Sequence, residues 1–403
     1  MKIISAKFHF YLKKASKAQV EKRRTTMGYK LDGNNALQVV AGRAPFLPLH
    51  ATVKRRVGVG CIASQVRGSC GKELNKLSLL DLPARIRKAD NRRVLYHSLI
   101  EQIGMSYLSG SINPQATTVL LLFVRLSFVE TIFREIAANA NCPLALAVSG
   151  SAQREDHAAS DIDGAVIPLN ANDDKSATAV QKEVSQLCGN IGIKFETPTS
   201  PELFNMGSLS WLSNLPDACK SFNWGLFLFT MDLGVLSVAG TRGVRGKFIS
   251  LLRVTHREQF RYNKQIADTY KAPNSEGLDK GDFSIKKNIL RCLCPAFYAL
   301  RGKDSLEMAS SWDLLVYAYL KNLINQEEYE KAESALSFFM GLRHDLAFLT
   351  DGEGPLTPDL LNKRGLSAIL SHRSLEKNQM LRQIKEAISD LAVCGNKIVG
   401  GCT

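Results

Sequence analysis

Two aspartates separated by a single residue are the most chemically informative feature of the sequence. Asp161 and Asp163 open the segment Asp-Ile-Asp-Gly-Ala-Val-Ile-Pro, which ends at Pro168. Successive side chains on a strand point to opposite faces, so both carboxylates would share one face. Two such groups repel each other unless a divalent cation lies between them, and Mg²⁺ prefers hard oxygen ligands of this kind. The spacing therefore predicts a Mg²⁺ or Mn²⁺ site suited to in-line phosphoryl displacement.

A turn shortly before the aspartates carries groups that suit phosphate. Gly150 and Ser151 follow an apolar run at residues 144–148. Glycine permits close approach of the backbone, and backbone amides together with a hydroxyl can hold phosphate oxygens. Arg154 can add positive charge beside a departing pyrophosphate. A lone Asp-x-Asp or Gly-Ser is usually a solvated strand edge, but their conjunction predicts a nucleoside triphosphate site.

Residues 142–222 are expected to form the small domain that positions these groups. The apolar and acidic patterns predict a strand, a turn, a second strand, a helix and a third strand, at residues 144–148, 149–160, 161–168, 174–190 and 191–196. The helix is expected to stop at Gly189. This order is typical of a small α+β domain with a mixed sheet.

Helices are expected on both sides of that domain. Residues 76–141 form a helical lead-in, with helices at 86–108 and at 113–140, where Asn113 is the expected N-cap before a proline. Residues 223–403 form an all-helical bundle domain. Its helical spacing is clearest in five segments: 225–238, 284–300, 311–324, 327–349 and 374–393.

Positive charge is concentrated near the N-terminus. Residues 1–99 contain 21 Lys and Arg against 5 Asp and Glu, and the whole chain has a net charge of +14. We expect residues 1–75 to be a basic, irregular or partly disordered extension. Three interpretations stay open for it: a solvated or partner-contacting extension, a contact for nucleic acid or another polyanion, and a targeting segment.

The remaining composition predicts a soluble cytoplasmic protein without a membrane partner. The longest apolar run, residues 119–124, is far shorter than the roughly 20 residues that a membrane span needs. The nine cysteines are odd in number and scattered, which favours reduced thiols over a disulfide framework.

The hairpin at residues 148–168 resembles the Gly-Ser…Asp-x-Asp signature of the DNA polymerase β superfamily. The wider chain, over about residues 80–350, is similar to the branch that contains protein-PII uridylyltransferase and nucleotidyltransferases attached to CBS-pair domains. The similar segments are Cys142-Pro-Leu-Ala-Leu-Ala-Val-Ser-Gly-Ser151, Leu226-Phe-Leu-Phe-Thr-Met-Asp232 followed by Ala239-Gly240, Asp282-Phe-Ser-Ile-Lys286 with Ala299-Leu-Arg301, and Phe338-Phe-Met-Gly-Leu-Arg-His344. The resemblance implies a polymerase β-type nucleotidyltransferase domain with flanking helices, followed by a helical domain.

The resemblance also implies roles for individual residues. Asp161 and Asp163 would bind the metal, and the Gly150-Ser151 turn would bind phosphate. The helical segment would shape the substrate cleft with basic residues at two recurrent positions, Lys286 and Arg343. No CBS-pair, phosphohydrolase or ligand-sensing domain is recognisable beside these segments.

A third catalytic carboxylate is not evident in the sequence. Glu196, on the expected third strand, is the first candidate and Asp232 the second. The segment also departs from the family pattern, because the Gly-Ser turn stands one residue closer to the aspartates and no glycine follows Arg154. These departures bear on the geometry of the phosphate turn.

Three functions are consistent with these features. The first is a Mg²⁺-dependent nucleotidyltransferase that moves an NMP from an NTP to a hydroxyl of a protein, a small molecule or RNA, with release of pyrophosphate. The second is a regulatory nucleotide-binding module without turnover. The third is a nucleic-acid-binding protein that uses residues 1–75.

Overall fold

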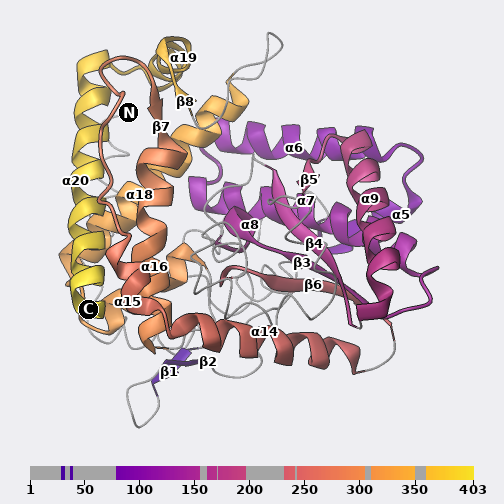
Figure 1. Ribbon diagram of the computed structural model, residues 1–403. Helices are drawn as coiled ribbons and strands as arrows, with labels where there is room; N and C mark the ends of the chain where they lie inside the picture. Colours follow the sequence, from indigo (N-terminus) through magenta and orange to yellow (C-terminus); the bar gives the residue numbers. More distant parts are fainter. Residues whose placement is uncertain are drawn as a thin grey trace.

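The computed structural model describes most of the chain from residue 79 onward. The described residues are 29–31, 37–39, 79–154, 161–169, 171–196, 231–240, 243–304, 310–349 and 360–403. They form a mixed α and β structure in which helices surround a small sheet and make up the C-terminal part (Figure 1). Within residues 1–75 the described part is one short antiparallel pair, β1 (Tyr29–Leu31) with β2 (Leu37–Val39). The rest of the expected basic extension lies outside the described residues.

The central sheet has four strands in the order β5-β4-β3-β6. The hairpin predicted from the sequence is confirmed: β3 (Leu144–Val148) pairs antiparallel with β4 (Ile162–Pro168). β6 (Gly234–Ala239) lies antiparallel on the other side of β3, and β5 (Phe195–Glu196) is parallel to β4. Every residue of β3 is buried, as expected for a central strand covered on both faces.

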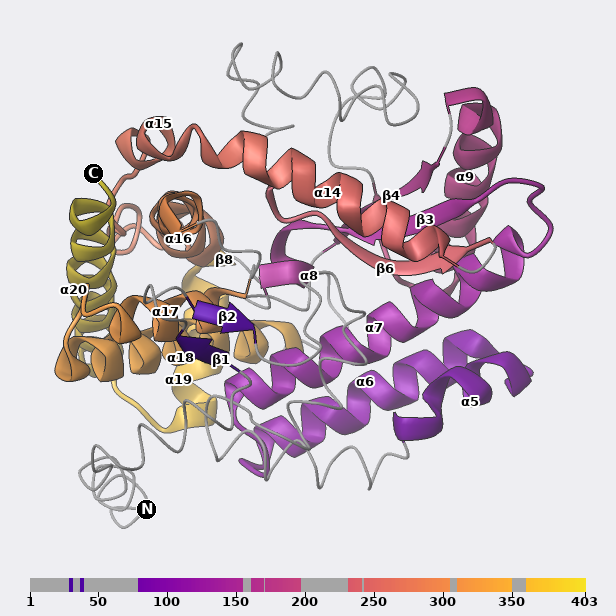
Figure 2. The ribbon, with the colours of Figure 1, turned by 90° about the horizontal axis from the view of Figure 1, so that it is seen from below.

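Helices cover both faces of this sheet (Figure 2). Alternate β3 residues pack in two different cores. Leu144 and Leu146 join a cluster with α7 (Pro114–Ala137) and α9 (Asp174–Ile191). Ala145 and Ala147 pack in a second cluster with side chains of α14 (Val244–Phe260). The period-two pattern of the strand thus divides the domain into helix, sheet and helix layers.

The predicted lead-in is helical, with one break. The helix expected at 86–108 is interrupted between α5 (Leu82–Lys88) and α6 (Arg92–Leu108), where Asn91 accepts a hydrogen bond from the Val94 amide at 3.1 Å and begins a new helix. The helix expected at 113–140 is confirmed as α7. Asn113 is its N-cap, accepting from the Ala116 amide at 2.8 Å.

Helix α7 corrects the expectation about apolar length. Residues 119–124 belong to a 24-residue helix that is long and apolar enough to cross a membrane, the one such helix among those described. Its most apolar window is nevertheless 100 % buried within the fold. It packs against α5, α6, α9, α18 and the sheet, which is the position of a core helix.

Two expectations about element ends are wrong. Helix α9 continues past Gly189 and ends at Ile191. Its C-cap is Gly192, whose φ of 99° allows its amide and the following one to bond back to the last turn. The helix expected at 225–238 does not extend over its last five residues, because β6 begins at Gly234. The β-branched, apolar run of β6 gains ladder hydrogen bonds beside β3, so the sheet extends past the boundary expected at residue 222.

The C-terminal part is mainly helical, as predicted, but it is not all-helical, because it also contributes β6 and a short antiparallel strand pair. Its principal core joins side chains from α16 to α20 in one cluster. The elements in chain order are α15 (Asn263–Asp268), β7 (Phe283–Ser284), the π-helix η4 (Lys286–Leu290), α16 (Arg291–Asp304), α17 (Ser311–Leu320), α18 (Gln326–Phe348), β8 (Leu360–Leu361), α19 (Lys363–Arg373) and α20 (Lys377–Cys402). No disulfide joins the cysteines of the described residues.

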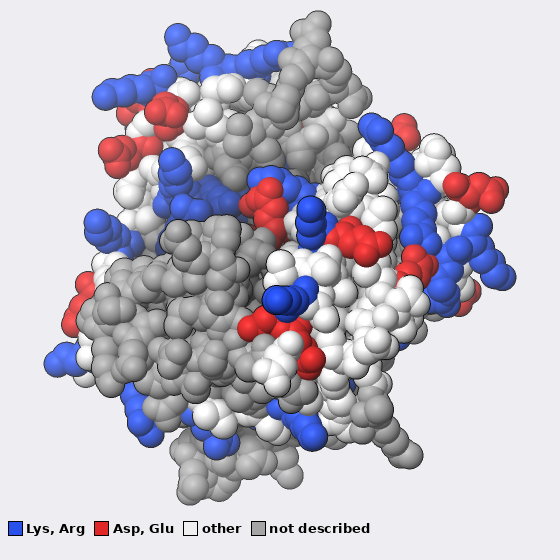
Figure 3. All heavy atoms as spheres, turned by 45° about the vertical axis from the view of Figure 1, so that its right-hand side comes forward, with Lys and Arg blue, Asp and Glu red and all other residues white. Residues whose placement is uncertain are grey.

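Charges of both signs are mixed on the face shown in Figure 3. There the described Lys and Arg side chains lie among Asp and Glu side chains rather than apart from them. On the described part of this face the charge pattern therefore does not single out a surface for a polyanion.

Candidate functional site

The aspartate pair lies at one end of the sheet, where β3 ends and β4 and β6 begin. Asp163 is the second residue of β4, and Asp161 comes directly before the strand. Ile162 between them is 1 % exposed and packs in the core with α7 and α9. The alternation expected from the sequence is therefore present, with the two acidic side chains on one face and the isoleucine on the other.

Burial and several neighbouring charged groups affect the pKa of Asp163. Burial raises it to about 6, and the charge of Asp161 is the next largest cause. Lys286 and Arg154 lower it, and Asp232 raises it further. Five of the residues singled out from the sequence thus lie close enough to act on one another.

The Gly-Ser turn lies directly against this pair. Gly150 has φ +61°, and a Cβ atom at this position would collide with Oδ2 of Asp163. The Ser149 amide donates to the Asp163 carbonyl at 2.8 Å, which fixes the turn to the strand. Gly150 begins the short helix α8 (Gly150–Arg154), and Ser151 in it is buried. Glycine is required here by conformation and by space.

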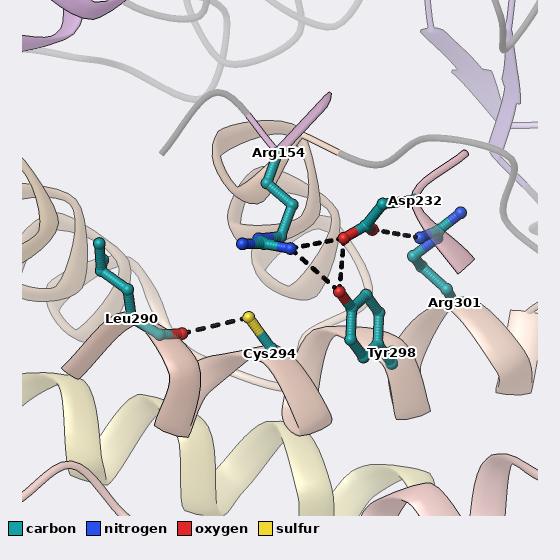
Figure 4. A network of polar contacts seen from close by, with 6 residues as sticks. All are labelled: Arg154, Asp232, Leu290, Cys294, Tyr298 and Arg301. Carbon is teal, nitrogen blue, oxygen red and sulfur yellow. Dashed lines mark hydrogen bonds and ion pairs between the residues drawn. The ribbon is translucent and has the colours of Figure 1, made fainter. Parts of the chain in front are cut away.

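Arg154 ends α8 in a buried polar network with the C-terminal part of the chain (Figure 4). Its Nη1 donates to Asp232 Oδ2 at 2.5 Å and to the Tyr298 hydroxyl oxygen at 3.2 Å. Tyr298 donates to the same Asp232 oxygen at 2.5 Å, and Arg301 Nη1 donates to Asp232 Oδ1 at 3.2 Å. One carboxylate is therefore shared by two guanidinium groups and a phenol.

The charged side chains of this network are fully or largely buried. The side chain of Asp232 is 0 % exposed, that of Arg301 1 % and that of Arg154 14 %. Burial raises the pKa of Asp232, while Arg154, Arg301 and the Tyr298 hydroxyl oppose that rise. We regard Asp232 as ionised, because two guanidinium groups bind it directly. Burial and the neighbouring Asp232 raise the pKa of Tyr298 well above its usual value.

Glu196 is placed beside the pair by strand register but is engaged elsewhere. It is the register partner of Asp163 in the parallel β4–β5 pair. Its carboxylate accepts from Lys194 at 2.8 Å, and both side chains are largely exposed. Glu196 raises the pKa of Lys194, as do Asp161 and Asp163, so Lys194 also lies near the aspartates.

Arg343 is not among the groups that act most strongly on Asp163. It lies on α18, 1 % exposed. Its neighbour His344 bonds to Thr118 Oγ1 at 2.8 Å and to the Pro114 carbonyl at 3.1 Å, both at the start of α7. His344 is itself 1 % exposed, so its ring is buried at this contact.

Three residues of this region were not predicted as site residues. Lys194 carries no signal beyond standing two residues from Glu196 on the same strand face. Tyr298 and Arg301 are three residues apart on α16, and so lie on one side of that helix, but nothing local shows which side faces Asp232. Their partners are 66 and 69 residues away in the chain.

The donor set fits a hard divalent cation at two ligands. Two carboxylates share one strand face, and the pKa of Asp163 is raised first by burial and next by the charge of Asp161, whose repulsion a cation would relieve. Among the described residues, no group of three or more His, Cys, Asp or Glu side chains is arranged to hold a metal. Phosphate oxygens and water would complete the coordination, as Mg²⁺ commonly requires.

Comparison with models of protein families and with curated proteins finds no match for this chain.

Proposed function

We propose that this chain is a Mg²⁺- or Mn²⁺-dependent nucleotidyltransferase of the polymerase β type. The observation that carries the proposal is the contact between the Gly150 backbone and the Asp163 carboxylate. It places a turn suited to phosphate directly against a carboxylate suited to a metal. A metal-bound nucleoside triphosphate needs both within a few ångströms.

The proposed role of each residue follows from its charge and its place in the site. Asp161 and Asp163 would hold the cation, which when bound neutralises phosphate charge and activates the acceptor hydroxyl. Gly150 and Ser151 would hold the phosphates. Arg154, as predicted from its place after the turn, would face the phosphates that leave as pyrophosphate.

Two more charged residues line the same region. Lys286 lies near enough to lower the pKa of Asp163 and can offset negative charge on the triphosphate. Glu196 is exposed and beside the pair in register, so it is better placed than Asp232 to accept the acceptor's proton. In this reaction the acceptor oxygen bonds to the α-phosphorus, the bond to the β-phosphate oxygen breaks, and pyrophosphate departs.

A second candidate is a nucleotide-binding module without turnover. The observation that favours it is that Asp232, a candidate third carboxylate, is already engaged by two arginines and a tyrosine. Such a site would bind a metal-nucleotide but lack a third acid for a second metal.

Experiments that measure label incorporation and nucleotide binding distinguish the transferase from the binding module. Protein is incubated with each α-³²P-labelled NTP, Mg²⁺ or Mn²⁺, and acceptor pools of protein, RNA and small molecules. Incorporation that disappears in D161N and D163N, but persists in the exposed-site control D279N, supports the transferase. Metal-dependent binding without incorporation supports the module. Absence of metal-dependent nucleotide binding refutes both.

A further inference from the structure

The buried network around Asp232 joins the phosphate turn to the C-terminal helices. Arg154 comes from α8, which begins at Gly150, whereas Tyr298 and Arg301 come from α16 (Figure 4). All three side chains bind the carboxylate of Asp232, which lies just before β6. The network is therefore a direct polar link between the phosphate turn and the C-terminal helices.

Asp232 is poorly suited to bind a metal in this arrangement. A carboxylate offers about four lone-pair positions, and three donors already occupy three of them on Asp232. Its side chain is fully buried, unlike those of the Asp161–Asp163 pair. To reach a metal it would have to leave the buried Arg301 guanidinium and the partly buried Arg154 guanidinium, which is strongly unfavourable.

The same geometry suits Asp232 to hold Arg154. Arg154 is the most exposed member of the network, at 14 %, and it also acts on Asp163. Tyr298 donates to the Asp232 oxygen that binds Arg154 and accepts from the same Nη1. Arg301 binds the other oxygen and so fixes the carboxylate plane.

We propose that Asp232, Tyr298 and Arg301 are positioning residues that hold Arg154 toward the terminal phosphates of the nucleotide. The inference rests on the proposed function and deepens it. Helix α16 then determines the preference for a triphosphate over a monophosphate. The two hairpin aspartates determine metal binding, and the two properties are separable.

A double-mutant cycle tests this positioning. The full chain is titrated with the best-bound of ATP, GTP, CTP and UTP, and with its monophosphate, both with Mg²⁺. We expect R154Q to reduce the triphosphate preference at least tenfold and Y298F about threefold to tenfold. The double variant should match R154Q alone, because Tyr298 acts only through Arg154. Y317F is the matched control, since Tyr317 makes a similar bond to Asp304 at 2.6 Å outside this network.

Metal binding provides the second readout. Mn²⁺ binding without nucleotide should be unchanged in Y298F and in the control Y317F, and lost in D161N and D163N. Additive effects of R154Q and Y298F on the triphosphate preference would overturn the positioning role. So would loss of Mn²⁺ binding in a folded D232N, which would make Asp232 a metal ligand. If the wild-type chain binds none of the nucleotides, the proposed function itself fails.

Discussion

Gly150 and Asp163 are in such close contact that a methyl group on the glycine would overlap the carboxylate oxygen Oδ2. Gly150 also has a positive φ of 61°. The turn at Gly150 and strand β4 are therefore closely packed against each other, with no room for a side chain at the glycine. A side chain at Gly150 would have to displace the carboxylate expected to bind the metal.

This contact predicts that Gly150→Ala disables the site. The left-handed backbone would cost the alanine variant about 1 kcal/mol of stability, and its methyl group would push the Asp163 carboxylate aside. We expect at least a tenfold loss of Mn²⁺ and nucleotide affinity, measured by calorimetry. Gly189→Ala is the control, because Gly189 lies within α9 with open space around its Cα and should gain stability. Full affinity in Gly150→Ala would contradict the assigned contact.

The raised pKa of Asp163 predicts pH-dependent metal binding. With a pKa of about 6, the carboxylate loses its charge on acidification below that value. Because a proton competes with the metal, the apparent Mg²⁺ affinity should fall by up to about tenfold per pH unit below 6. Titrations between pH 5 and 7.5 measure this. Constant affinity over that range would mean that Asp163 does not bind the cation.

The same shift affects stability in the opposite sense when no metal is present. The pKa of Asp163 is above the ordinary value of 3.8, so the folded protein binds this proton more tightly than the unfolded chain. Its contribution to the free energy of unfolding is complete below pH 4 and decreases as the pH rises to 6, by at most about 3 kcal/mol. Asp163→Asn should therefore be more stable than wild type at pH 7 in urea unfolding, and Mg²⁺ should stabilise only the wild type.

Lys286 is expected to support both the aspartate and the nucleotide. Its charge lowers the pKa of Asp163, so Lys286→Gln should raise that pKa further above 6 and move the pH dependence of metal binding upward. Nucleotide affinity should also fall several-fold, because one positive charge near the phosphates is lost. Lys287→Gln is the matched control on the exposed neighbour. Equal effects of the two substitutions would remove Lys286 from the site.

His344 predicts acid lability in the C-terminal part. Burial lowers its pKa from 6.5 to about 3. The folded protein therefore holds the ring neutral, and its contribution to stability is complete above pH 6.5 and decreases as the pH falls toward 3, by up to about 1.4 kcal/mol per unit. Urea unfolding of His344→Gln should show less loss between pH 6.5 and 5 than wild type. The exposed His372→Gln should behave as wild type.

The sequence alone determined the hairpin and its chemistry. Gly150, Asp161 and Asp163 lie within one strand–turn–strand unit, so local periodicity is enough to place both carboxylates on one face near the turn. The start of a helix could also be predicted where the capping side chain is close in sequence, as at Asn113. Such features depend on residues only a few positions away, and the sequence shows these residues directly.

Only the tertiary structure decided which charges are available to the site. Glu196 was the first candidate for the third acid in the sequence and Asp232 the second, but Asp232 is held by Arg154 and Arg301, and Glu196 is paired with Lys194. The strand β6 that leads from Asp232 was read as a helix, because short apolar runs fit both periods. Ion pairing between residues 69 to 78 positions apart depends on burial and on competition for partners. Those quantities exist only once the helices have packed on the sheet.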